Sequence, residues 1–364
     1  MRRRFPTTVR RMAYRVIVWG TGNVGRAALR TVVANPALEL AGVLVANPAK
    51  VGRDAGALCG LPAQGVVATD DVGRLLGAGA DAVAYCASGD FRPDAALDDV
   101  ERCLRAGLNV VSTSIYPLYD PTSAPEALRR RFERACQDGS ASCFVTGIEP
   151  GFISDLVPLL LSGLCEEIHE IRAIELFNYE FYEQPDAVRY LVGFGMPMDS
   201  VPPMVAPGIP TLVWGGQVRL IARGLGLPLQ GVREVVERLP LERDVTNRLG
   251  LFERGTQGAL RFEVQGIVDG RPKIVVEHVN RICDDIAPHW PKPDGGGAHG
   301  VRITGRPNIN LILEAEDDRG DRAGGGNATA AARIVNAIPF VCDASPGLLD
   351  ALAVPLQIGR GLVR

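Results

Sequence analysis

The 364-residue sequence lacks the features that mark membrane, secreted and metal-binding proteins. No apolar run reaches the roughly 18 residues needed to cross a bilayer. The eight cysteines include no C-x-x-C pair, and none stands at metal-ligand spacing from one of the four histidines. A disulfide framework is unexpected in so long a chain with so few cysteines. We therefore predict reduced thiols, a cytoplasmic location and no bound metal.

The sequence also lacks a strong excess of charge of either sign. Its 39 Lys and Arg residues against 42 Asp and Glu residues give a net charge of −3 at pH 7. Residues 1–12 are basic but contain no apolar core, so they do not form a secretory signal. This balance gives no reason to expect nucleic acid or a membrane as a partner. We therefore expect small-molecule partners.

The first part of the chain alternates short apolar runs with amphipathic helical stretches, which is the pattern of βαβ units. The expected strands are residues 15–19, 38–46, 66–68, 82–86, 109–112 and 142–146, with helices at 24–34, 71–76, 93–106 and 124–137. Strands joined by crossover helices must pair in parallel. Residues 13–150 are therefore predicted to form a Rossmann domain.

The texture of the sequence changes after Gly147. A helix is expected at 153–164 and a strand at 171–177, followed by proline-rich and helical segments to about residue 241. Four strand-like runs at 258–268, 273–280, 299–304 and 308–313 are separated by turn sequences. They predict an α+β domain at 151–326 with an open, mainly antiparallel sheet. The whole chain is thus of the α/β class.

The last predicted element is a helix at 327–337. Asn327 is expected to cap its first turn, and Pro339 is expected to end it. We expect residues 327–364 to pack back on the Rossmann domain.

The sequence Gly20-Thr21-Gly22-Asn23-Val24-Gly25 is the strongest motif. It lies between a predicted strand and a predicted helix, as a dinucleotide-binding turn requires. Gly20 permits the tight turn, Gly22 lets the pyrophosphate approach the backbone, and Gly25 lets the helix pack closely. The helix N-terminus then favours the phosphate charge. The motif predicts binding of NAD or NADP.

The acidic residue expected roughly 20 positions after the motif is absent. Asn47, Lys50 and Arg53 stand there instead, and the two cations can pair with a ribose 2′-phosphate. NADP is therefore favoured, with NAD left open. Further cofactor contacts are predicted at strand ends and on the last helix, at Cys86, Ala87, Ser88, Thr113, Ser114 and Asn336.

Five short segments resemble those of native amine dehydrogenases and of their relative 2,4-diaminopentanoate dehydrogenase. They are GTGNVG at 20–25, VGRDAGALCG at 51–60, NVVST at 109–113, GIEPGF at 147–152 and VNAIP at 335–339. The N-terminal half also resembles the N-terminal domain of dihydrodipicolinate reductase. The resemblance implies hydride transfer from NAD(P)H to an imine formed from a carbonyl compound and ammonia, in a homodimer.

The chain departs from these families at two places. Dihydrodipicolinate reductases carry a paired-histidine motif, whereas His169 stands alone here, so that reaction is not expected. Amine dehydrogenases of this type place a glutamate just after the NVVST-like strand, where this chain has Ser114 and Tyr116. Glu149 lies after the neighbouring parallel strand and can face the same crevice. We predict that Glu149 is the catalytic carboxylate, with capping of the next helix as the alternative role.

An aromatic-rich segment near residues 177–182 suggests an apolar substrate pocket, with core packing as the alternative. The predicted pocket residues are Tyr116, Phe152, Asn178, Phe181, Tyr182, Phe194 and Met196. They favour small hydrophobic aldehydes or ketones, with ammonia as the second substrate. A carbonyl or cyclic-imine reductase, an enzyme with a Cys86 or Cys143 nucleophile, and a non-catalytic NADP-binding sensor remain open.

Overall fold

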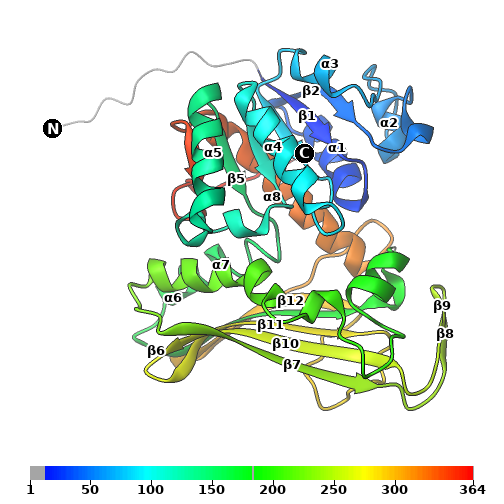
Figure 1. The fold of residues 1–364 in the computed structure, drawn as a ribbon, viewed down its shortest axis with the longest axis vertical. Helices are drawn as coiled ribbons and strands as arrows, with labels where there is room; N and C mark the ends of the chain where they lie inside the picture. The colour runs from blue at the N-terminus through cyan, green and yellow to red at the C-terminus, as the bar shows by residue number, and fades with distance from the viewer. Residues whose placement is uncertain (1–12, 183, 364) are drawn as a thin grey trace.

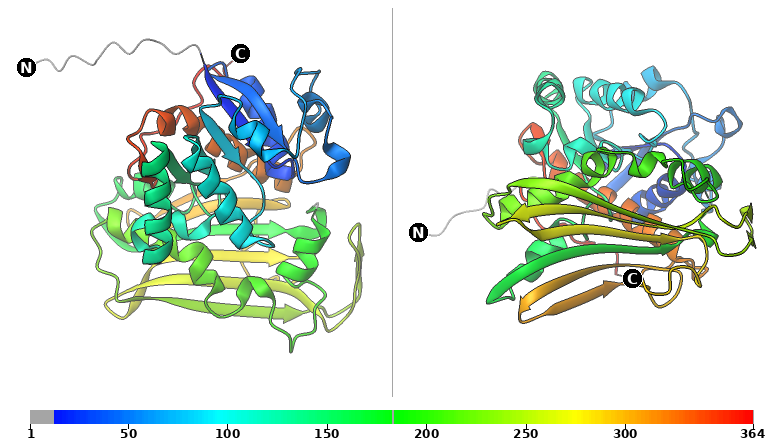
Figure 2. Two further views of the ribbon diagram at one scale, coloured as in Figure 1. Left: turned by 45° about the horizontal axis from the view of Figure 1, so that its top comes forward. Right: turned by 60° about the horizontal axis from the view of Figure 1, so that its bottom comes forward.

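The computed structural model describes residues 13–182 and 184–363, so the basic segment 1–12 lies outside the described residues. The chain forms two layers, a Rossmann half above a large twisted sheet (Figure 1). Figure 2 shows the large sheet as a separate layer from two further directions. Within the described residues, no helix combines the length and apolarity required to cross a membrane.

The upper layer is a six-stranded parallel sheet, which confirms the predicted Rossmann fold. Its order is β14-β5-β4-β3-β1-β2. The strands are β1 (Tyr14–Trp19), β2 (Leu38–Leu44), β3 (Ala82–Tyr85), β4 (Asn109–Ser112), β5 (Ser142–Val145) and β14 (Gly347–Leu349). The helices of this half are α1 (Asn23–Ala34), α2 (Ala55–Cys59), α3 (Val72–Leu76), α4 (Pro93–Arg105), α5 (Glu126–Gly139) and α8 (Arg322–Cys342).

Both faces of the parallel sheet are buried, because its strands are apolar at nearly every position. Side chains at alternate positions of β1, such as Val16 and Val18, pack with α1 and α8 on one face. Ile17 and Trp19 point the other way and pack with α4 and α5. This double burial explains why the strands read as continuous apolar runs.

Two strands of this half differ from expectation. Residues 66–68 form no sheet strand, and Val67 makes only an isolated bridge to Asp54. Asp54 accepts hydrogen bonds from the backbone N–H groups of Gln64 and Gly65. These bonds hold the chain before residue 66 in a closed loop. The sixth strand is instead β14, which pairs with β5 and is too short for the sequence to show a period.

The lower layer is a six-stranded sheet of order β13-β12-β6-β11-β10-β7. Its strands are β6 (Glu167–Asn178), β7 (Gly231–Pro240), β10 (Gln257–Val268), β11 (Arg271–Arg281), β12 (Gly297–Arg306) and β13 (Ile309–Leu313). All neighbours pair antiparallel except β11 and β6, which are parallel, so the predicted mainly antiparallel sheet is confirmed. The separate hairpin β8 (Val245–Asn247) and β9 (Gly250–Phe252) extends beyond it.

Strand β7 corrects the expectation of helix before residue 241. It is an edge strand with mostly half-buried or exposed residues, so its apolar side chains follow no strict alternation. The helices α6 (Leu156–Ser162) and α7 (Ile209–Gly224) precede it. Figure 1 shows both between the large sheet and the Rossmann half. Helix α7 packs on β10 and β11, so it covers one face of the large sheet.

The last helix is longer than predicted at both ends. Asp321 caps α8 by accepting hydrogen bonds from the backbone N–H groups of Ala323 and Gly324 at 3.2 and 3.0 Å. Asn327 lies inside the helix and donates to the carbonyl of Ala323. Pro339 also lies inside it, because burial of the helix against the parallel sheet keeps the last turn helical. Because the first turn of α8 is rich in glycine, the sequence did not predict a helix there.

We predict that the Asp321 side chain stabilises the first turn of α8 as its cap and that Asn327 contributes less. Asp321→Ala leaves two N–H groups without an acceptor and is expected to lower the free energy of unfolding by about 1 kcal/mol. The matched control Asn327→Ala should cost less. Urea unfolding followed by circular dichroism measures both. A larger loss in Asn327→Ala would contradict the assignment.

Candidate active site

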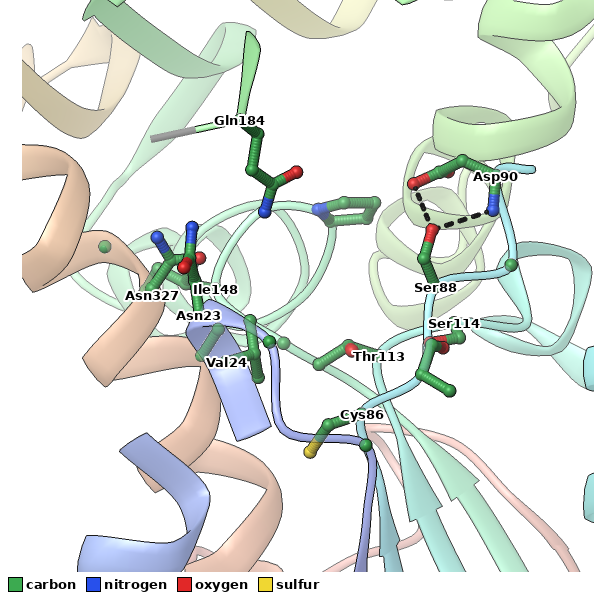
Figure 3. Close-up of a pocket in the computed structure, with 18 of the residues that line it drawn as sticks. Asn23, Val24, Cys86, Ser88, Asp90, Thr113, Ser114, Ile148, Gln184 and Asn327 are labelled. Atoms are coloured by element: carbon green, nitrogen blue, oxygen red, sulfur yellow. Dashed lines mark hydrogen bonds between the residues drawn. The ribbon is translucent and has the colours of Figure 1, made fainter. Parts of the chain in front are cut away.

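A cavity of about 630 Å³ lies between the two layers, at the carboxyl ends of the parallel strands (Figure 3). From the Rossmann half it is lined by the glycine turn and by the loops that follow β3, β4 and β5. From below it is lined by Glu175, Phe177, Tyr179, Tyr182, Gln184 and His299, and from the side by the first turns of α8. In open α/β sheets this edge is where ligands bind.

The loops on one wall of the cavity are tied together by short hydrogen bonds. Figure 3 shows Ser88, Asp90 and Ser114 on this wall, across from Asn23 and Asn327. Ser88 donates to Asp90 at 3.0 Å, and Tyr116 donates to the other oxygen of Asp90 at 2.6 Å. Ser114 donates to the carbonyl of Ala87 at 2.6 Å. This wall is therefore preformed.

The glycine turn has the geometry of a dinucleotide-binding turn. A Cβ atom on Gly20, whose φ is +98°, would lie 2.8 Å from the nitrogen of Ala87, and one on Gly25 would lie 2.0 Å from the oxygen of Gly20. A Cβ on Gly22 would meet nothing within 4 Å, so that backbone faces open space. No side chain caps the start of α1. The free N–H groups and the open approach at Gly22 fit a pyrophosphate.

A second cavity of about 400 Å³ adjoins the turn at the end of β2. It is lined by Thr21, Gly22, Asn23, Arg26, Lys50, Arg53, Ala57 and Leu58, with no carboxylate among them. Lys50 donates to the backbone oxygen of Thr21 at 2.9 Å and to its hydroxyl at 3.1 Å. Burial, together with the charges of Arg26 and Arg53, lowers the pKa of Lys50. Three cationic side chains, Arg26, Lys50 and Arg53, therefore line this small cavity.

Most of the predicted cofactor residues line the main cavity. They are Gly20, Thr21, Gly22, Asn23, Val24, Asn47, Lys50, Cys86, Ala87, Ser88, Thr113 and Ser114. Gly25 lies behind the turn, and Arg53 lines the second cavity. Asn336 lies outside both, because it accepts a hydrogen bond from Asn35 at 3.1 Å in the contact between α8 and α1. Asn327, earlier on α8, lines the cavity in its place.

The predicted substrate residues are divided. Tyr116 and Tyr182 line the cavity, whereas Phe152, Asn178, Phe194 and Met196 do not. Phe194 is a core residue with its ring against Tyr179, and Phe152 packs against the Arg333 guanidinium. The side chain of Phe181 lies outside the part of the chain whose side chains the structure describes.

The other two follow from backbone geometry. Asn178 ends β6, accepts a hydrogen bond from the backbone of Glu180 and lines a different, smaller cavity. The carbonyl of Met196 accepts from the backbone of Gln257, which holds its loop at the start of β10. The aromatic wall is instead completed by Phe177, Tyr119 and Tyr179.

Glu149 lies in a tight turn after β5 and lines the cavity. The turn needs glycine at Gly151, where a Cβ would lie 2.4 Å from the oxygen of Gly147. The Glu149 side chain is 1% exposed, and its Oε2 accepts a hydrogen bond from Trp214 Nε1 at 2.7 Å. Its Oε1 is buried with no hydrogen-bond partner. Asp155, not Glu149, caps α6, so the capping alternative is wrong.

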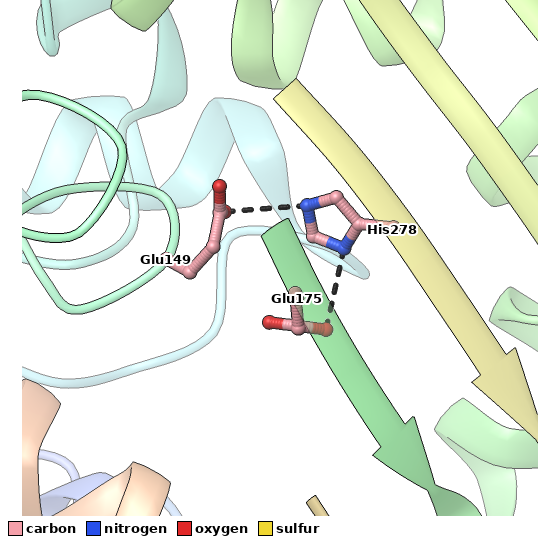
Figure 4. A group of neighbouring side chains, drawn as sticks. All are labelled: Glu149, Glu175 and His278. Carbon is pink, nitrogen blue, oxygen red and sulfur yellow. Dashed lines mark ion pairs between the residues drawn. The ribbon is translucent and has the colours of Figure 1, made fainter. Parts of the chain in front are cut away.

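Three further titratable residues beside Glu149 were not predicted. His278 Nε2 lies 3.4 Å from Glu149 Oε2, and His278 Nδ1 lies 3.2 Å from Glu175 Oε1 (Figure 4). His299 Nε2 lies 3.6 Å from the other oxygen of Glu175. Ligand atoms of Glu149, Glu175 and His278 lie within 4.8 Å of one another, close enough for an ion-pair network or a shared cation. In the sequence, the only sign of these three residues was that each is a polar residue within a strand-like run.

The charges of this cluster stabilise one another. Burial by itself lowers the pKa of His278, but Glu175 and Glu149 outweigh burial and raise that pKa to about 10. Burial raises the pKa of Glu175, but His278 and His299 outweigh it and hold that pKa well below its ordinary value. His278 is therefore an imidazolium at neutral pH.

Cys86 lines the cavity but does not have the properties of a nucleophile. Its thiol donates to the carbonyl of Ala84, and burial raises its pKa to about 12. Burial also raises the pKa of Cys143 well above its usual value. Because the thiolate is the reactive form, these values argue against the cysteine alternative.

Comparison with known proteins places these features in a family. Residues 14–114 match the family described as dihydrodipicolinate reductase, N-terminus, and residues 152–361 match the 2,4-diaminopentanoate dehydrogenase C-terminal domain. An amine dehydrogenase of Streptomyces virginiae is 55% identical, over 94% of this chain and 97% of that protein. The 2,4-diaminopentanoate dehydrogenase of Acetoanaerobium sticklandii is 26% identical, over 94% and 93%. The fold matches the structure of an amine dehydrogenase from Mycobacterium smegmatis with a TM-score of 0.76, at 20% identity, over 95% and 97% of the two chains.

The two glycines Gly22 and Gly25 are predicted to separate cofactor binding from stability. Gly22→Ala places a methyl group in the open approach to the turn and should raise the KM for the nicotinamide cofactor about tenfold with an unchanged Tm. Gly25→Ala forces α1 away from the turn and should cost about 1–3 kcal/mol of unfolding free energy. Thermal unfolding and cofactor titration test both. Loss of stability in Gly22→Ala would refute the open approach.

Proposed function

The chain belongs to the family of amine dehydrogenases and 2,4-diaminopentanoate dehydrogenases, and we propose that it reductively aminates small hydrophobic aldehydes or ketones with ammonia. It is an oxidoreductase that uses a nicotinamide dinucleotide. One observation carries the proposal: Glu149 presents a buried carboxylate oxygen without a partner in the cavity that adjoins the dinucleotide turn.

Reductive amination needs one group that handles protons and positive charge. Glu149 can take a proton from ammonium, return it to the hydroxyl that leaves as water, and stabilise the iminium cation electrostatically. The hydrogen bond from Trp214 occupies Oε2, which leaves Oε1 for the substrate nitrogen. When bound, the reduced nicotinamide supplies the hydride.

The walls of the cavity favour an uncharged, apolar carbonyl compound. Six aromatic side chains line it: Phe91, Tyr116, Tyr119, Phe177, Tyr179 and Tyr182. Among its described lining residues the only lysine and arginine are Lys50 and Arg92. Lys50 is held at the dinucleotide turn, and Arg92 is paired with Asp99 at 2.8 Å. A substrate carboxylate would therefore find no lysine or arginine near Glu149 to pair with.

The second cavity supports NADP as the preferred cofactor. Arg26, Lys50 and Arg53 line it without a carboxylate that would repel a 2′-phosphate. A carboxylate at this place would instead have bound the ribose hydroxyl of NAD.

The assembly and location are proposed on separate grounds. The family resemblance supports a homodimer. All eight cysteines are free, as expected for a protein of a reducing compartment such as the cytoplasm.

The central test is Glu149→Gln. This variant keeps the size of the side chain but loses its proton-accepting carboxylate, so kcat should fall by about 10²–10⁴-fold. NADPH oxidation is followed by its absorbance. We expect the wild-type enzyme to oxidise NADPH only when a small ketone or aldehyde and ammonium chloride are both present. The matched control Glu242→Gln, at an exposed position in the loop after β7, should keep wild-type rates.

Two results would decide against the proposal. Equal oxidation of NADPH without ammonium would identify a carbonyl reductase. Tight NADPH binding without turnover of any carbonyl compound would favour a sensor.

The cofactor preference is tested with Arg53→Ala. Loss of one of three cations should raise the KM for NADPH about tenfold and leave the KM for NADH nearly unchanged. Arg254→Ala, at an exposed arginine far from the turn, is the control. A parallel rise for both cofactors would mean that Arg53 does not recognise the 2′-phosphate.

A further inference from the structure

Glu149 is only the front member of a larger charged cluster. Behind it, three side chains occupy one row across neighbouring strands of the large sheet. Glu175 on β6 stands opposite His278 on β11 and opposite His299 on β12. Backbone pairing of these strands therefore sets the spacing of the row, and side-chain rearrangement alone cannot separate its members.

The ring of His278 is held in one orientation. It stacks on Phe262 of β10 at 4.6 Å with an interplanar angle of 10°, and Trp214 of α7 packs against it at 4.5 Å. The two elements that cover the ring thus present only neutral aromatic groups. Each ring nitrogen faces one carboxylate, Glu149 from the Rossmann half and Glu175 from the sheet.

Other titratable groups surround the two carboxylates. His299 faces Glu175 from β12. The charges of Glu175 and Glu149 act on Tyr179, and those of Glu149 and Asp155 act on Tyr119. Both tyrosines have a pKa raised well above the usual value, mainly by burial, so they stay neutral.

The cluster has an asymmetric relation to the cavity. Glu149 and Glu175 line it, whereas His278, which is 1% exposed, is not among the lining residues. Glu149 and Glu175 thus meet the cavity in front, and the imidazolium of His278 lies behind them. The Oε1 atom of Glu149 is buried and has no hydrogen-bond partner. A cationic nitrogen bound in front would therefore interact with both carboxylates and could donate to the oxygen that lacks a partner.

We propose that Glu149 and Glu175 form a subsite for a single cationic nitrogen, and that His278, which lies between them, is the positioning residue that offsets the repulsion between the two carboxylates. The ligand class is ammonium, the iminium intermediate or the product alkylammonium. The inference rests on the proposed amine dehydrogenase activity and adds Glu175 and His278 to it.

Removal of the imidazolium has a specific consequence. Glu149 and Glu175 carry ligand atoms within 4.8 Å of one another, so without His278 their negative charges would repel with no cation to compensate them. Protonation would relieve that repulsion, so the variant should lose its proton-accepting capacity at a higher pH than the wild type does. If Glu175 is removed as well, the repulsion disappears.

The test is the pH profile of ammonium-dependent NADPH oxidation in four enzymes. His278→Asn should move the acid limb of kcat/KM for ammonium upward by at least about one pH unit and raise the KM for ammonium about tenfold. Glu175→Gln should raise the KM for ammonium without moving the acid limb upward. The double variant should return the acid limb to its wild-type position. His169→Asn, an exposed histidine on β6, is the matched control.

The outcomes separate the two proposals. If wild type requires ammonium and Glu149→Gln is inactive, but His278→Asn lowers the rate equally at every pH, the subsite is refuted while the activity stands. If wild type needs no ammonium, the proposed function itself fails. Loss of wild-type activity with a chelator, restored by a divalent metal, would identify a metal centre and overturn the subsite.

A measurement on the NADPH complex covers the case in which His278→Asn does not fold. Ammonium chloride should raise the Tm of the wild-type complex relative to potassium chloride at equal ionic strength. This difference should disappear in Glu175→Gln. Its persistence in Glu175→Gln, or its absence in wild type, would refute the subsite.

Discussion

The contact between Glu149 and His278 is the interaction on which the arrangement of the two layers depends. Both side chains are almost fully buried, and they come from different halves of the molecule. A buried charge is tolerated only when an opposite charge or hydrogen bonds compensate it, and loss of one partner typically costs about 3–5 kcal/mol. The Rossmann loop and the large sheet must therefore meet where these groups pair. The same constraint places the charged cluster beside the dinucleotide turn.

Helix α7 makes this meeting possible, because it contacts both layers. Its Trp214 donates to Glu149 near its start. Near its end, Arg223 pairs with Asp120 at 2.9 Å and also with Asp350, both from the Rossmann half. A partly buried arginine shared by two carboxylates fixes orientation as well as distance. One helix of the lower layer is thus anchored to the Rossmann half at two places, which fixes how the two layers face each other beside the site.

Glu149, the carboxylate proposed to accept the proton, lies on a different loop than the one that the family resemblance implies, and the residues around it fit this position. With Ser114 and Tyr116 after β4, that wall is tied by neutral hydrogen bonds and by Asp90. The charge lies instead on the β5 loop, where it meets His278. Moving a buried carboxylate requires a new compensating group, and the large sheet provides it. The position of the acid and the identity of its partner are therefore linked.

The sequence by itself determined the Rossmann half, the glycine turn and the place of Glu149, because a βαβ unit is local and its loops always emerge at the carboxyl edge of the sheet. Only the tertiary structure decided that Glu175, His278 and His299 meet Glu149. Strand β6 is a direct neighbour of β11 and β12 in the sheet but lies far from both along the chain, and register is set by pairing between such distant segments. The sequence also did not show which turn of α8 faces the cavity. Burial of the opposite side of that helix, and not its local sequence, places Asn327 at the site.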